Sequence, residues 1–114
     1  MLLSTDVWVS ALIRHAELEG AFATVVRKGD ARAGDVIIKA YNTSERTARL
    51  YSQSVDMNGQ PLWIQPVTSE MESELDAYLE RRRGYDPDLW VVEIEDRHGR
   101  HFIPDKVEGE KSDS

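Results

Sequence analysis

The chain is 114 residues long, with 31% charged residues, a formal net charge of −7 at pH 7 and no cysteine. This length corresponds to one domain with a modest core. The lack of cysteine excludes disulfides, thiolate zinc sites, iron–sulfur clusters and cysteine nucleophiles. No apolar run is long enough to span a membrane, and the start lacks the basic region of a secretory signal, so we expect a cytoplasmic protein.

The negative charge is concentrated in the C-terminal part of the chain. Acidic and basic residues balance up to residue 66, after which fourteen acidic residues accompany seven basic ones. Proteins that bind duplex nucleic acid usually present a basic face that neutralises phosphates. The charge distribution therefore argues against nucleic acid as the partner.

The first segment, about residues 6–19, is predicted to form an amphipathic helix. Val9, Leu12 and Ala16 recur with helical spacing, and Gly20 stands where a helix commonly ends. We expect the apolar face of this helix to cover a sheet.

The middle of the chain is predicted to form four short strands rich in β-branched and aromatic residues. They span about residues 22–27, 36–41, 47–53 and 62–67. The two-glycine segment after the first strand and the Asn-Gly pair after the third are typical of hairpin connections. Short hairpins indicate an antiparallel sheet.

A second helix is predicted over about residues 69–83. Ser69 and Glu72 fit a capping box, in which each side chain bonds the backbone N–H of the other residue. Alternating apolar residues then predict a strand at residues 90–95, and a short last strand is expected at residues 101–103.

These elements predict an α+β fold with the order α-β-β-β-β-α-β, extended by the optional last strand. We expect an antiparallel sheet of about five strands with both helices packed on one face. The domain is predicted to span residues 1–104, followed by a disordered polar tail over 105–114. The predicted core residues are Leu12, Ile13, Val25, Ile38, Leu50, Ile64, Leu75, Val92 and Ile94.

The densest polar cluster lies near the end of the domain, between Glu93 and His101. Glu93 and Glu95 share one face of a strand, and the following turn brings His101 back toward them. Two carboxylates and an imidazole are suitable ligands for a divalent metal, or a general base with its orienting partner. The alternative is the hydrated face of a hairpin. No catalytic motif occurs, so no catalytic residue and no cofactor other than this metal is predicted.

Two other features are candidates for partner binding. Trp63 follows Pro61 on a predicted edge strand, where a tryptophan can serve as an exposed anchor. Arg81, Arg82 and Arg83 form a basic run at a helix end, although consecutive helical residues point in different directions. Their alternative role is to offset the helix dipole.

Several stretches of the chain resemble one small family of uncharacterised alphaproteobacterial proteins, known only as a domain of unknown function. The most specific stretches are Asp-Pro-Asp-Leu-Trp-Val at residues 86–91 and Glu-Asp-Arg at 95–97 followed by Gly-Arg-His-Phe at 99–102. The resemblance covers about residues 5–103. It implies a bacterial protein forming one domain, and it implies no reaction.

The leading functional hypothesis is a small interaction or regulatory module that binds a protein partner or a second copy of itself. It follows from the small size, the missing catalytic motif and a sheet that we expect to have one uncovered face or edge. The alternative is a metal-binding protein or a small hydrolase-like enzyme that uses the Glu93–His101 hairpin.

Overall fold

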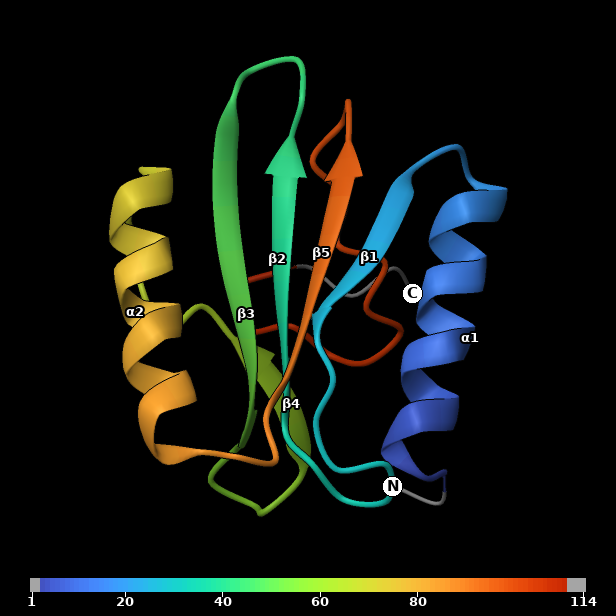
Figure 1. Cartoon of the computed structure of the whole chain (residues 1–114), viewed down its shortest axis with the longest axis vertical. Helices are drawn as coiled ribbons and strands as arrows, with labels where there is room; N and C mark the ends of the chain where they lie inside the picture. The colour runs from blue at the N-terminus through green and yellow to red at the C-terminus, as the bar shows by residue number, and fades with distance from the viewer. Residues whose placement is uncertain (1–2, 111–114) are drawn as a thin grey trace.

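The computed structural model describes residues 3–110 and contains two helices and a five-stranded sheet (Figure 1). The elements in chain order are α1 (Thr5–Leu18), β1 (Phe22–Arg27), β2 (Val36–Asn42), β3 (Thr47–Val55), β4 (Pro61–Ile64), α2 (Glu72–Tyr85) and β5 (Trp90–Asp96). The predicted α+β class and the order of these seven elements are confirmed. In this part of the chain, no helix is long and apolar enough to cross a membrane.

The last strand in sequence lies near the middle of the sheet, whose strand order is β1-β5-β2-β3-β4. β5 runs parallel to β2, with Val92 opposite Ile38, and antiparallel to β1, with Glu93 opposite Thr24. The sheet is therefore mixed, and the prediction of an entirely antiparallel sheet is wrong at the β2–β5 pair.

The two-glycine segment after β1 is a close crossing and not the predicted hairpin, because β5 separates β1 from β2. A Cβ atom at Gly29 or Gly34 would overlap the Asp88 carbonyl oxygen. The Trp90 indole N–H donates a hydrogen bond to the Asp30 carbonyl at 2.7 Å. Glycine is required here so that the loop can pass directly against the start of β5.

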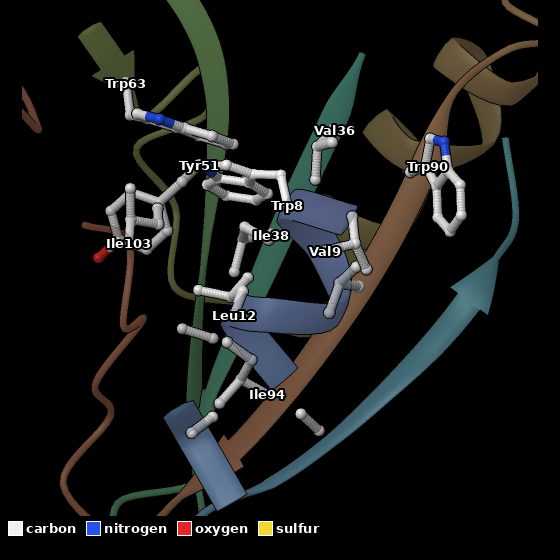
Figure 2. Packing of buried hydrophobic residues seen from close by; sticks show 14 of the residues in the cluster. Trp8, Val9, Leu12, Val36, Ile38, Tyr51, Trp63, Trp90, Ile94 and Ile103 are labelled. Atoms are coloured by element: carbon white, nitrogen blue, oxygen red, sulfur yellow. The ribbon is translucent and has the colours of Figure 1, made fainter. Parts of the chain in front are cut away.

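The two helices cover opposite faces of the sheet, contrary to the prediction of one shared face (Figure 1). Trp8 and Leu12 of α1 pack in the larger hydrophobic cluster, which includes Ile38 of β2 (Figure 2). Leu75 of α2 belongs to a second cluster, which includes Ile37. Adjacent strand residues point to opposite faces, so β2 is buried on both.

Most of the predicted core is buried. The six buried members are Leu12, Ile38, Leu50, Leu75, Val92 and Ile94. Ile13 and Ile64 are partly buried, whereas Val25 is 36% exposed. Val25 differs because β1 is an edge strand with a neighbour on one side only.

Two element boundaries differ from the sequence prediction. α2 begins at Glu72, and Met71 is its N-cap residue without a side-chain capping bond. Ser69 instead accepts a hydrogen bond from the Met71 N–H at 3.0 Å, so the predicted capping box is not formed. β4 ends at Ile64, before Pro66, which cannot donate to a strand ladder.

The chain after β5 forms no further strand at residues 101–103, and it folds back over the α1 side of the sheet. Val107 is buried and forms a parallel bridge with Trp63 of β4. Part of the segment predicted to be a disordered tail is thus packed in the core. Residues 111–114 lie outside the described residues.

Candidate interaction surface

β1 is an open edge of the sheet. Within residues 3–110 it pairs with β5 alone. Phe22 and Val26 are 61% and 53% exposed, although both side chains are apolar. Its one charged residue, Arg27, is held at the end of the strand by a hydrogen bond to the Asp86 carbonyl at 2.8 Å. An edge strand without protecting charges is a template for pairing with another chain.

The opposite edge, β4, is closed by the C-terminal segment. The backbone N–H of Trp63 donates a hydrogen bond to the Lys106 carbonyl, and the backbone N–H of Glu108 donates one to the Trp63 carbonyl. Each bond is 2.8 Å long. The Trp63 ring is 2% exposed and stacks on Trp8 with 5.3 Å between ring centroids (Figure 2). Trp63 is therefore a core residue, and the prediction that it is an exposed partner anchor is wrong.

The open edge continues onto an uncovered strip of the sheet on the α2 side. Five strands at about 4.8 Å spacing are wider than one helix of about 10 Å diameter. α2 packs mainly against β3. A pocket of about 280 Å³ therefore remains beside α2, lined in part by Val26, Val91 and Leu79. Val26 is the residue of β1 that lines this pocket.

Lys39 is one of the residues that line this pocket, and it is 6% exposed. Its ammonium group contacts Glu72 at 2.7 Å, Asp76 at 3.0 Å and Glu93 at 3.3 Å. Burial alone would lower the pKa of Lys39, but the hydrogen bonds to Glu72 and Asp76 outweigh burial and raise it. The lysine stays charged and joins α2 to β2 and β5.

The structure does not bring the three predicted metal ligands together. Glu93 and Glu95 lie on the α2 side of β5, and Glu93 contacts Lys39. His101 lies on the other side of the sheet, with its ring 4.7 Å from the Tyr51 ring. Residues 3–110 hold no group of three or more His, Asp or Glu side chains placed to bind a metal ion. This geometry contradicts a metal site shared by these residues.

Both ring nitrogens of His101 are engaged. Its Nδ1 accepts a hydrogen bond from the Ile103 N–H at 2.9 Å, which assigns the ring proton to Nε2. The Nε2 atom donates to Glu110 at 2.9 Å. A ring held in this way has no free nitrogen to act as a base or a ligand.

A pocket of about 400 Å³ beside His101 is lined mainly by polar residues, of which Arg49, Arg100 and Glu110 already have polar partners. The Arg49 guanidinium bonds Glu70 at 3.0 Å. The Arg100 Nε donates to Asp96 at 2.9 Å. Burial raises the pKa of Tyr51, and the nearby Arg49 opposes that shift. The charged side chains are satisfied internally, so the pocket presents no unpaired charge to a ligand.

Asp96 organises the turn that leads into the C-terminal segment. It is 3% exposed and accepts hydrogen bonds from the side chain and the backbone N–H of Arg100, and from the His98 N–H. The Arg100 hydrogen bond, supported by the backbone N–H groups, lowers the pKa of Asp96 to about 2.

Each of the three arginines at the end of α2 contacts another residue of the same helix. Arg82 donates to the Tyr78 hydroxyl at 3.2 Å, and Arg83 pairs with Glu80 at 3.1 Å. The Arg81 guanidinium lies 5.8 Å from the centroid of the Tyr78 ring. They do not form one basic patch.

The open edge at β1 is the feature that sequence reasoning missed. Its signal was the run of five uncharged residues from Phe22 to Val26, since natural edge strands usually carry charges or proline. Pro61 instead favoured β4 as the exposed edge.

The fold is a small α+β domain with a mixed five-stranded sheet between two helices. The chain belongs to the family described as "Protein of unknown function (DUF1491)", whose model matches residues 3–104. This membership confirms the resemblance to an uncharacterised family. No curated protein matches the chain.

Solved structures of similar proteins share this fold. The crystal structure of a DUF1491 family protein from Caulobacter crescentus has 63% identity and a TM-score of 0.91, covering 94% of this chain and 100% of that chain. An NMR structure of a DUF1491 family protein from the same organism has 62% identity, a TM-score of 0.88 and coverage of 96% and 99%. A protein from A. tumefaciens has 30% identity, a TM-score of 0.73 and coverage of 93% and 98%. None of these descriptions assigns an activity.

Proposed function

We propose that the protein is an interaction module that binds an extended segment of a protein along the open edge of β1. The observation that carries this proposal is the contrast between the two edges, because β4 is closed by the C-terminal segment and β1 has exposed apolar side chains. In strand addition, backbone hydrogen bonds supply affinity and side-chain contacts supply specificity.

The side chains of β1 offer contacts on both faces of an added strand. Phe22 and Val26 lie on the α2 side, next to the uncovered strip, and Val25 lies on the α1 side. An incoming strand with apolar residues at alternate positions would cover both sets. The charged side chains that line the pocket of this strip already pair with one another. Lys39 contacts Asp76 and Glu93, and Arg83 contacts Glu80.

A matched pair of substitutions tests this proposal. Val26→Asp places a carboxylate on the open edge, and Val55→Asp makes the same change at another exposed strand valine, on β3. We expect a partner recovered from host lysate by the original chain and by Val55→Asp to be lost with Val26→Asp. The β1 amides should exchange more slowly with solvent in the complex. A partner retained equally by all three proteins, with unchanged β1 exchange, would contradict the proposal.

A further inference from the structure

We propose that the segment bound along β1 is the β1 strand of a second copy, paired antiparallel with Thr24 on the two-fold axis. This inference rests on the proposed function, and it names the partner of the same edge. The result is a continuous ten-stranded sheet in a closed dimer.

The alternation of β1 defines which side chains meet in such a pair. Thr24 lies opposite Glu93 on the α2 side, and Val25 lies opposite Val92 on the α1 side. Val26 lines the pocket that contains Lys39, on the α2 side. The register irregularity of β1 falls between Val25 and Arg27. Phe22, Thr24 and Val26 therefore share one face.

The Thr24-centred register matches this alternation. It places Phe22 opposite Val26 of the second copy on one face, and Ala23 opposite Val25 on the other. Residues that lie opposite each other in an antiparallel pair must have their side chains on the same face of the sheet. Sliding one strand by a single residue would place side chains of opposite faces across from each other, so that register is excluded. Apolar cross-strand pairs of this kind stabilise a sheet.

Neighbouring allowed registers are poorer. A pair centred on Val25 places Ala23 opposite the charged Arg27. A pair centred on Ala23 places Val25 opposite Ala21 and Val26 opposite Gly20, and both of these partners lie outside the strand. The Thr24 register alone pairs all five uncharged residues of β1 with one another. It brings no like charges together.

Pairing along β1 also removes the remaining open edge. The outer edges of the dimer sheet would be two copies of β4, each closed by its own C-terminal segment. The two-fold pair is closed, so it does not continue into a fibre.

The charge of the protein predicts the salt dependence of this association. Each copy carries a net charge of −7, yet residues 22–26 carry none. The two negatively charged copies repel each other at long range, whereas the paired β1 strands contain no ion pair. Added salt should therefore screen the repulsion and strengthen the dimer. An interface built on ion pairs would weaken instead.

The chain has no cysteine, so one introduced thiol reports on the register. In Thr24→Cys, the two thiols face each other across the axis, where opposed Cβ atoms are about 4.5–5.5 Å apart. We expect a short thiol-specific cross-linker to give a covalent dimer. Met57→Cys, at the fully exposed β3–β4 turn, is the control and should stay monomeric.

Light scattering on the unmodified chain provides the second measurement. We expect twice the 13.0 kDa monomer mass at high protein concentration, with the dimer favoured by salt. Val26→Asp places a carboxylate against the apolar Phe22 of the second copy, so it should weaken association by about tenfold or more. Val55→Asp should associate like the unmodified chain.

The outcomes separate this inference from the proposed function. A chain that is monomeric up to millimolar concentration, with no cross-linking beyond the Met57→Cys control, overturns the self-pairing. The proposed function survives that result if Val26→Asp still abolishes binding of a different protein. A dimer that is indifferent to Val26→Asp and is not cross-linked through Thr24→Cys overturns pairing along β1 altogether.

Discussion

The two edge strands of the sheet differ in whether another part of the chain covers them. β4 is four residues long, contains Pro61 and is closed at Trp63, whose backbone N–H donates to the Lys106 carbonyl and whose carbonyl accepts from the Glu108 N–H. β1 is six residues long, has no charge before Arg27 and has no second neighbour within residues 3–110. One edge is protected within the chain, and the other is available for protection by another chain. Substitutions at the closed edge should therefore destabilise the monomer more than substitutions at the open edge.

Substitution of a buried residue at the closed edge should give the largest loss in the free energy of unfolding. Trp63→Ala removes a buried indole that stacks on Trp8, so we expect a loss of about 3–5 kcal/mol in the free energy of unfolding. Urea denaturation measures this loss. Phe22→Ala removes an aromatic ring from the open edge and is the control, with an expected loss below about 1 kcal/mol. Equal losses at the two positions would contradict the contrast.

The charged group beneath the uncovered strip should be the next most sensitive. Lys39→Met leaves Glu72, Asp76 and Glu93 without their shared cation, and we expect a loss of about 2–3 kcal/mol in the free energy of unfolding. This is less than for a fully enclosed pair because the carboxylates are partly exposed. Arg49→Met breaks a surface ion pair with Glu70 and should cost below about 1 kcal/mol. If both substitutions cost the same, Lys39 does not anchor α2.

The turn that leads into the closing segment should make stability depend on pH. The pKa of Asp96 is about 2, below the ordinary value of 3.8 for an aspartate, so its carboxylate stabilises the folded protein above pH 3.8. That stabilisation is lost as the pH falls from 3.8 through about 2. We expect Asp96→Asn to lose about 2 kcal/mol at pH 7 and progressively less toward pH 2.

Denaturation of the variant and the unmodified chain across this pH range measures the effect. Asp56 accepts backbone N–H groups at the exposed β3–β4 turn, and Asp56→Asn is the matched control with a smaller expected loss. If the difference in free energy of unfolding between Asp96→Asn and the unmodified chain stays constant from pH 7 to pH 2, the charge of Asp96 is not its source.

The open edge should tolerate substitution with the smallest effect on the monomer. Val26→Asp at low protein concentration should change the free energy of unfolding by about 0.5 kcal/mol or less, because Val26 is already half exposed. Thermal denaturation at increasing concentration sharpens this prediction, since only the unmodified chain should gain stability from association. A large loss in the dilute monomer would mean that Val26 supports the fold itself.

The local elements could be predicted from the sequence because each leaves a short-range pattern. Helical spacing of Val9, Leu12 and Ala16 located α1, and β-branched runs located β1 to β3 with small errors at their ends. The boundaries of α2 were less accurate because Ser69 resembled a capping residue.

The arrangement of these elements depends on contacts between distant residues, which no local pattern records. The insertion of β5 between β1 and β2 joins residues more than fifty positions apart, and it turned a predicted hairpin into a crossing. The same limit explains Trp63, whose burial depends on Trp8 and Val107. Glu93 and His101 are close in sequence but are separated by the sheet itself.

Residue-resolved amide hydrogen exchange tests the central contrast between the edges most directly. We predict that the Trp63 amide exchanges slowly at every protein concentration, because it bonds the Lys106 carbonyl. The outward amides of β1 should exchange rapidly in the dilute monomer and slow down as the concentration rises or a partner is added. Two results would contradict this account. One is a Trp63 amide that exchanges as fast as the outward amides of β1 in the dilute monomer, and the other is outward β1 amides that exchange rapidly at every concentration and with every partner.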